Sequence, residues 1–78
     1  MPARSKDLLA LGQTLREARE KRGLSQERLA LEADLDRTFI SSIEAGRRNI
    51  TFASLLKVAR ALDLKPTEIL RRWEQLAK

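Results

Sequence analysis

The stretch LSQERLALEADLDRTFISSIEAG, residues 24–46, contains two helical patterns that are separated by only a few residues. Ser25 is a favoured N-cap for the first helix, which we expect to end near Ala33. Asp36 is a suitable N-cap for the second helix, and Gly46 is the residue type that often follows a helix C-terminus. Two helices joined by a turn of about three residues form a helix-turn-helix, so the stretch predicts this motif.

The sequence on either side of the motif predicts three further helices and no strand. Apolar residues recur with a period of about 3.6 residues, and turn-forming residues interrupt the pattern. The further helices are expected from Ser5 or Lys6 to Arg22, from an N-cap at Thr51 to about Leu62, and from Pro66 onward. The predicted fold class is therefore all-α: a compact five-helix domain whose second and third helices form the helix-turn-helix.

The length of 78 residues predicts a single domain. We expect residues 1–5 to form a frayed N-terminal tail and residues 6–78 to form the domain, with the last helix used for dimerisation. A chain this short buries only about 60% of its unfolded surface, so a lone monomer should have modest stability. Pairing with a second copy would increase that stability.

The composition narrows the possible functions. The chain has 16 Lys and Arg against 11 Asp and Glu, a net charge of +5, which favours an acidic partner such as nucleic acid. Cys and His are both absent, which excludes a disulfide and a thiolate metal site and removes the commonest general base and metal ligand. We therefore expect no catalytic set, no enzyme activity, no metal and no cofactor. The sequence shows no separate effector domain, so no small-molecule ligand is implied. No apolar run approaches the ~20 residues of a membrane span, and the N-terminal apolar run is too short for a signal peptide. A cytoplasmic location is the default expectation.

The outer face of the second helix of the motif carries side chains that suit the major groove of DNA. A recognition helix enters this groove by its N-terminal end. Arg37 could make a bidentate bond to guanine, and Thr38 could contact thymine through its methyl group or bond through its hydroxyl. Ser41 and Ser42 add short hydroxyls to the same face. These four residues are the predicted base readers.

Polar residues around the motif are predicted to contact the DNA backbone. Gln26 lies at the start of the first helix of the motif, where the helix dipole favours an anion. Arg47, Arg48 and Asn49 follow the second helix, and Thr51 adds a hydroxyl beside the amides that open the next helix. Each phosphate that is neutralised should make binding more sensitive to salt.

Several of these residues also have an ordinary structural interpretation. Arg37 could be a surface arginine, and Arg47 with Arg48 could belong to a solvated loop. Phe39 could pack at the seam between the two helices or contact a thymine methyl group, and packing is slightly favoured. Two helices with a short turn are common in helical bundles, so the pair of helices does not by itself indicate DNA binding. The run Ile-Ser-x-Ile-Glu-x-Gly at 40–46 favours DNA binding through the family resemblance that it carries.

The run from Leu24 to Leu64 resembles the phage-repressor/Cro-like (XRE-type) helix-turn-helix family. The matching positions are Ser25, Gln26, Leu29, Ala30, Leu35, Ile40, Ser41, Ile43, Glu44, Gly46, Leu55, Ala59 and Leu62. More narrowly, DRTFISSIEAGRRNIT, residues 36–51, is similar to the controller proteins of bacterial restriction–modification systems. Those are small five-helix dimers that regulate the restriction gene and their own gene. One departure is Asp34, where many members have Gly, although Asp tolerates a left-handed backbone better than most residues.

The resemblance implies roles for individual residues. By this resemblance Arg37, Thr38 and Ser42 read bases, Gln26 anchors a phosphate, and Arg48 or Asn49 contacts the backbone or a flanking base. It also implies an ion pair between Arg19 and Glu44 that ties the first helix to the third. The helical pattern itself leaves both of these charges at the edge of the apolar core.

The last helix carries more apolar residues than so small a core can cover. We expect the surplus to form a symmetric dimer, with these residues of the last two helices near the two-fold axis: Phe52, Leu56, Ile69, Leu70, Trp73 and Leu76. The two recognition helices would then lie about 34 Å apart on one face of the DNA.

The expected function is a dimeric, sequence-specific, DNA-binding transcriptional regulator that acts on pseudo-palindromic operators. The expected partners are double-stranded DNA and a second copy of the chain, and the resemblance points to a restriction–modification controller protein. Two alternatives remain: another stand-alone repressor or antitoxin of the same fold, and a protein-interaction module without DNA binding.

Overall fold

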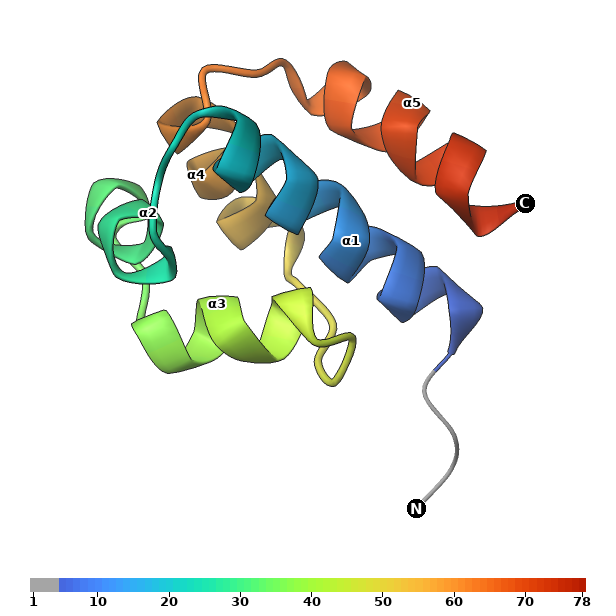
Figure 1. Cartoon of the computed structure of the whole chain (residues 1–78), viewed down its shortest axis with the longest axis horizontal. Helices are drawn as coiled ribbons and strands as arrows, with labels where there is room; N and C mark the ends of the chain where they lie inside the picture. Colours follow the sequence, from blue (N-terminus) through green and yellow to red (C-terminus); the bar gives the residue numbers. More distant parts are fainter. Residues whose placement is uncertain (1–4) are drawn as a thin grey trace.

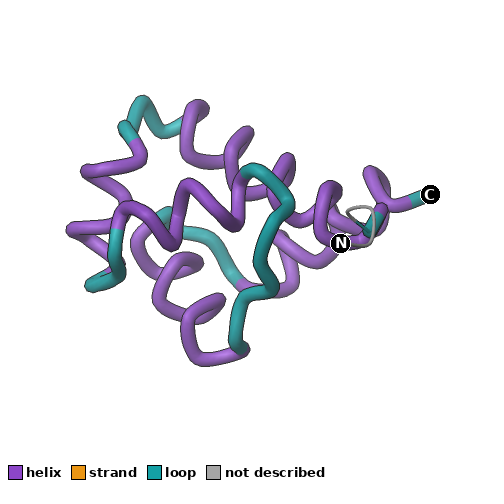
Figure 2. The backbone as a smooth tube through the Cα atoms, turned by 90° about the horizontal axis from the view of Figure 1, so that it is seen from below, coloured by secondary structure: helices purple, strands orange, loops and turns teal. Residues whose placement is uncertain are grey.

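The computed structural model describes residues 5–78, which form five helices and no strand (Figures 1 and 2). The helices are α1 (Lys6–Lys21), α2 (Gln26–Ala33), α3 (Arg37–Glu44), α4 (Phe52–Ala61) and α5 (Pro66–Ala77). The predicted all-α fold class and the order of the helices are confirmed. Within residues 5–78, none of these helices has the length and apolar character needed to span a membrane.

The predicted N-caps explain where the helices begin. The side-chain oxygens of Ser25, Asp36 and Thr51 each accept a hydrogen bond from a backbone N–H in the first turn of their helix. Such a cap satisfies a donor that the helix itself leaves without a partner. Ser5, assigned to the tail on sequence grounds, caps α1 by accepting from the backbone N–H of Leu8. The rest of the predicted tail, residues 1–4, lies outside the described residues.

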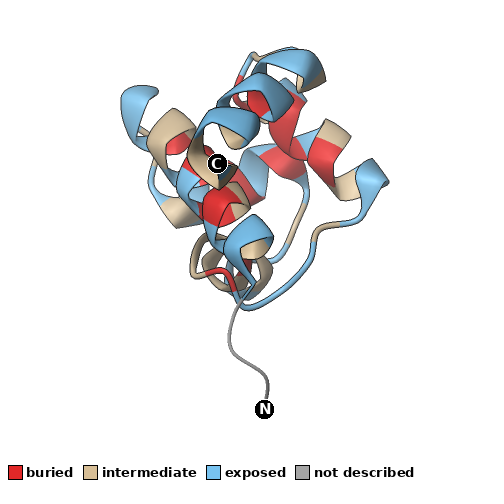
Figure 3. Ribbon diagram, turned by 90° about the vertical axis from the view of Figure 1, so that its right-hand side faces the viewer, coloured by how far each residue is buried: buried red, intermediate tan, exposed pale blue. Residues whose placement is uncertain are grey.

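The helix α1 crosses the middle of the domain and packs against α3 on one side and α5 on the other (Figure 1). The helix α2 packs against α3 and α4. The buried faces of the helices converge on one apolar core (Figure 3). Its most deeply buried large side chains are Leu29, Ile43, Val58, Leu62 and Ile69.

A close helix crossing fixes α1 against the end of α3. A Cβ atom on Gly12 would lie 2.4 Å from the carbonyl oxygen of Glu44 and 2.5 Å from that of Ile43. Only glycine fits such a distance to backbone atoms. Gly46, whose φ is +74°, similarly lies against Leu9 of α1. The C-terminal end of α3 therefore has a defined position on α1.

The helix α5 is attached to α1 by polar contacts as well as by packing. The indole Nε1–H of Trp73 donates to the backbone carbonyl of Asp7 at 3.0 Å, and Arg72 pairs with Glu17 at 3.1 Å. The hydrogen bonds that Gln13 and then Arg72 donate lower the pKa of the Glu17 carboxyl, so this carboxylate stays charged to more acidic pH. These contacts hold α5 against α1.

One residue expected at the dimer surface lies elsewhere. Ile69 is 1% exposed and belongs to the core of the single chain. A side chain that is already buried has no surface to offer to a second copy, so Ile69 is removed from the predicted interface. The sequence pattern had shown that α5 is apolar, but not which apolar residues face its own domain.

Candidate nucleic-acid interface

The turn between α2 and α3 sets the direction in which α3 leaves the core. It consists of Asp34, Leu35 and Asp36, and Asp34 adopts the left-handed conformation with φ of +56°. The backbone N–H of Leu35 bonds the carbonyl of Ala30 at 2.9 Å, which closes the end of α2. This is the helix-turn-helix that the sequence predicts. The departure at Asp34 is accommodated as expected, in a conformation that costs most L-residues about 1–2 kcal/mol.

The helix α3 separates its apolar and polar residues onto two faces. Ile40 and Ile43 are buried in the core. Arg37 and Thr38 are exposed, and Ser41 and Ser42 are half-buried. Positions one, two, five and six of a helix lie on the same side, so the structure brings the four predicted base readers together.

The acidic N-cap of α3 is committed to the helix. Asp36 Oδ1 accepts from the backbone N–H of Thr38 at 3.1 Å. A carboxylate at this position interacts favourably with the positive end of the helix dipole. Asp36 thus supports the end of α3 that a groove would meet, although its charge would repel nearby phosphates.

A buried ion pair fixes the other end of α3. Arg19 Nε donates to Glu44 Oε2 at 2.7 Å and Arg19 Nη2 donates to Glu44 Oε1 at 3.0 Å, which is the bidentate arrangement. Arg19 Nη1 also donates to the carbonyl of Leu24 at 2.7 Å. The exposed fractions of the two charged side chains are 11% and 4%. The hydrogen bonds to Glu44 raise the pKa of Arg19 above its ordinary value, despite partial burial. The implied pair is present, and its role is structural.

Gln26 is half-buried, and both ends of its side-chain amide contact other residues of the protein. Its Nε2 donates to Glu44 Oε1 at 3.0 Å, and its Oε1 accepts from Arg37 Nη1 at 3.4 Å. The sequence suggested only a phosphate contact for this residue. The amide partners were missed because they lie eleven and eighteen residues away along the chain.

The loop after α3 carries the residues predicted to contact the DNA backbone. Arg47, Arg48, Asn49 and Thr51 are all exposed. Asn49 Oδ1 accepts from the N–H of Ile50, which leaves its amide nitrogen as a donor. The hydroxyl of Thr51 donates to Ser54 Oγ at 2.9 Å. The hydroxyl proton of Thr51 is therefore already used in a hydrogen bond within the cap of α4. The backbone N–H groups of the first turn of α4 are better placed to donate to a phosphate.

The structure shows which of the two roles considered for Phe39, packing or DNA contact, fits its position. Its ring is half-buried and packs against the apolar core. The guanidinium of Arg48 lies over the ring, 5.0 Å from its centroid, which is within the range of a cation–π interaction. Phe39 therefore packs, and its ring supports Arg48 beside α3.

The charges on this surface favour a polyanion. Between residues 37 and 51 the basic side chains are Arg37, Arg47 and Arg48, and the acidic one is Glu44. Because Glu44 is buried and paired with Arg19, the exposed charges of this segment are all positive. We call the surface formed by the outer face of α3 and the loop 46–51 the α3 surface.

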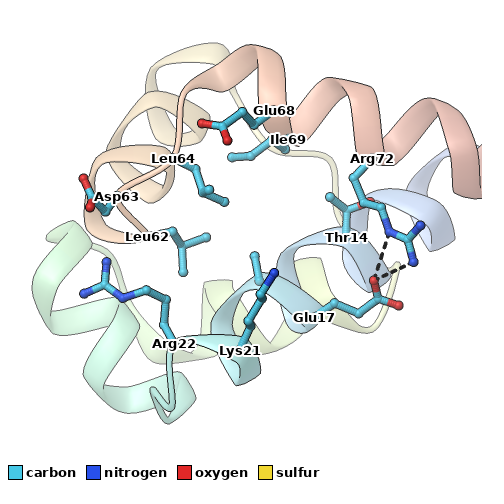
Figure 4. Close-up of a pocket in the computed structure, with 11 residues that line it drawn as sticks. Thr14, Glu17, Lys21, Arg22, Leu62, Asp63, Leu64, Glu68, Ile69 and Arg72 are labelled. Carbon is cyan, nitrogen blue, oxygen red and sulfur yellow. Dashed lines mark hydrogen bonds and ion pairs between the residues drawn. The ribbon is translucent and has the colours of Figure 1, made fainter.

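A separate groove lies away from the α3 surface. It has a volume of about 640 Å³ and is lined by residues of α1, the turn before α5 and α5 itself (Figure 4). Leu62, Leu64 and Ile69 provide apolar lining, while Lys21 and Glu68 provide charges of both signs. None of its lining residues comes from α2 or α3, so the groove is not part of the candidate interface.

Comparison with known proteins identifies the class to which this fold and surface belong. Residues 15–69, well over half of the chain, match a family model described as helix-turn-helix. The chain therefore belongs to the helix-turn-helix family.

Within that family the chain is similar to restriction–modification controller proteins. It is 44% identical over 63 residues to the control protein C.BamHI of Bacillus amyloliquefaciens, covering 80% of this chain and 78% of the relative. A solved structure of the controller protein C.AhdI of Aeromonas hydrophila has a TM-score of 0.82 and 46% identity, covering 83% of this chain and 98% of that one. A structure of the controller protein C.Esp1396I, as a tetramer with its natural 35 base-pair operator, has a TM-score of 0.86 and 30% identity, covering 94% and 96%.

Proposed function

We propose that this protein is a DNA-binding transcriptional regulator of the restriction–modification controller type, acting as a dimer on a pseudo-palindromic operator. The proposal depends on the exposed outer face of α3, which carries Arg37 and Thr38 at its N-terminal end and is followed at its C-terminal end by a loop whose exposed charges are positive. The similarity to control proteins, one of them solved on its operator, supports the same function. The proposed role is not enzymatic, and a cytoplasmic location follows from it.

The α3 surface divides into two kinds of contact. Arg37, Thr38, Ser41 and Ser42 would meet base edges in the major groove, where an arginine bonds guanine through two hydrogen bonds. The exposed arginines of the loop would contact phosphates, with Asn49 and the first N–H groups of α4 as neutral donors. Sequence preference would come from the first set and salt sensitivity from the second.

The dimer would use apolar side chains of α4 and α5 that the single chain leaves uncovered. Phe52 is 72% exposed and Leu70 is 47% exposed, while Leu56, Trp73 and Leu76 are half-buried. Large apolar groups in contact with water are the residue type that a symmetric interface covers. Two α3 helices about 34 Å apart would then read two half-sites one helical turn apart.

The test of this function compares DNA binding by the wild type, Arg37→Ala and Arg16→Ala. Arg16 is an exposed arginine of α1 whose partner is Glu20, so its variant changes net charge by the same amount. On operator DNA recovered by selection, Arg37→Ala should lose about 1–3 kcal/mol of binding and relax the preference at one base pair. Arg16→Ala should retain the preference at every position.

The outcome for Arg37 separates the two kinds of contact. Equal weakening on operator and unrelated DNA would make Arg37 a phosphate contact. Affinity for a protein partner together with no DNA binding by the wild type would favour the alternative of an interaction module.

Sedimentation of the wild type and Phe52→Glu tests the dimer, and a dimer that persists in Phe52→Glu would place the interface away from Phe52.

A further inference from the structure

A chain of hydrogen-bonded side chains connects the interior of the domain to the outer face of α3. Its buried end is the Arg19–Glu44 ion pair. Gln26 Nε2 donates to Glu44 Oε1 at 3.0 Å, and Gln26 Oε1 accepts from Arg37 Nη1 at 3.4 Å. Gln26 is thus the link between a fixed carboxylate and the guanidinium that we propose reads a base.

The chemistry of Glu44 determines which way the Gln26 amide points. A carboxylate only accepts hydrogen bonds, so the amide nitrogen has to face it. The amide oxygen then faces Arg37, which can only donate. Because Arg19 holds Glu44 through two bonds, the amide is attached to a group that does not itself move freely.

We propose that Gln26 is a positioning residue that restricts the Arg37 guanidinium before DNA arrives and so increases selectivity at the base pair that Arg37 reads. The inference rests on the proposed function, in which Arg37 reads a base. An exposed arginine has many rotamers, and their loss on binding opposes complex formation. If a partner already restricts the arginine, less side-chain entropy is lost when the arginine binds a base pair that fits its restricted position.

The length of the Gln26–Arg37 contact suits this role. The distance of 3.4 Å is longer than the usual range of about 2.7–3.2 Å, so this is a weak contact that biases the guanidinium without holding it against a stronger, bidentate partner. A phosphate anchor would act differently, because it would strengthen binding to every DNA sequence equally.

The first experiment measures base discrimination by the wild type, Gln26→Met, Arg37→Ala and the double variant. Each protein is titrated with its selected operator and with operators in which single base pairs are replaced. Gln26→Met should reduce discrimination about three- to tenfold at the base pair that Arg37→Ala identifies, and only there. In the Arg37→Ala background it should cause no further loss. Gln13→Met is the matched control, because Gln13 is an exposed glutamine that bonds Glu17 on α1.

The second experiment observes Arg37 without DNA. The heteronuclear NOE of the Arg37 Nε–H group reports fast motion of this side chain. It should fall in Gln26→Met and stay unchanged in Gln13→Met. Gln26→Met should remain folded, because Glu44 keeps both bonds from Arg19. An unchanged NOE in Gln26→Met would overturn the proposal.

The outcomes distinguish a failure of this inference from a failure of the proposed function. If Arg37→Ala alters a base-pair preference and Gln26→Met does not, only the positioning role is overturned. Equal loss on all sequences in Gln26→Met would also overturn it and return Gln26 to phosphate anchoring. If Arg37→Ala alters no preference, base reading by Arg37 is overturned, and selectivity through Gln26 with it.

Discussion

Removal of Arg19 tests the interaction that holds α3 in place. In Arg19→Met the Glu44 carboxylate would remain buried without its cation and without the bidentate bonds of 2.7 and 3.0 Å. Breaking one partner of a buried pair typically costs about 3–5 kcal/mol. A domain of this size has a total stability of only about 4–12 kcal/mol. Arg19→Met should therefore lose a large part of its free energy of unfolding.

Urea unfolding provides the assay, and two further variants make it decisive. Arg19→Met/Glu44→Met replaces both charges by apolar groups, so it should recover most of the loss, because no buried charge remains. Arg16→Met is the control: Arg16 pairs with Glu20 at 3.3 Å, but both side chains are more than half exposed. Exposed pairs contribute about 0–1 kcal/mol.

Two results would contradict this role of the buried ion pair. A loss in Arg19→Met no larger than that in Arg16→Met would show that the buried pair contributes as little as an exposed one. A double variant as unstable as Arg19→Met would show that the packing of the arginine stem matters, and not the unpaired carboxylate. If Arg19→Met is unfolded altogether, the double variant still distinguishes these explanations.

Three single substitutions test the helix crossing, the turn and the basic loop. Gly12→Ala should lose about 1–3 kcal/mol of stability although alanine favours helix, because its Cβ would meet backbone carbonyls at 2.4 and 2.5 Å; an unchanged urea midpoint would contradict this close crossing. Asp34→Gly should gain about 0.5–1 kcal/mol, since glycine adopts the left-handed conformation at no steric cost, and a loss would mean that the aspartate side chain contributes to the turn. Arg48→Ala should weaken binding to all DNA sequences and reduce the slope of log K against log salt by about one unit, whereas an unchanged slope would remove Arg48 from the interface.

Local signals made the helix-turn-helix predictable from sequence. Ser25, Asp36 and Thr51 cap their helices through hydrogen bonds that span two or three residues, so the residue type and its position were sufficient. The inward face of α3 followed from the spacing of Ile40 and Ile43. The pair Arg19–Glu44 could be predicted because each charge lay at the edge of an apolar stripe and the family resemblance indicated the partner.

Contacts between segments that are distant in the sequence were harder to predict. The assignment of Ile69 failed because an apolar pattern does not reveal whether a side faces its own core or a second copy. The contacts of Gln26 require the positions of α2 and α3 in space. Gly12 did leave a signal, since a glycine inside a helix costs about 1 kcal/mol and usually has a packing reason, but the neighbour that it accommodates is more than thirty residues away.

In the proposed function, two copies of the α3 surface read one DNA site together. The most direct measurement is selection of bound sequences from a DNA pool randomised over about three helical turns, at moderate salt and with the wild-type chain. We expect an enriched pseudo-palindrome whose half-sites are centred about one helical turn apart. Salt-sensitive binding with no enriched sequence would contradict it, because the α3 surface would then bind phosphates without reading bases.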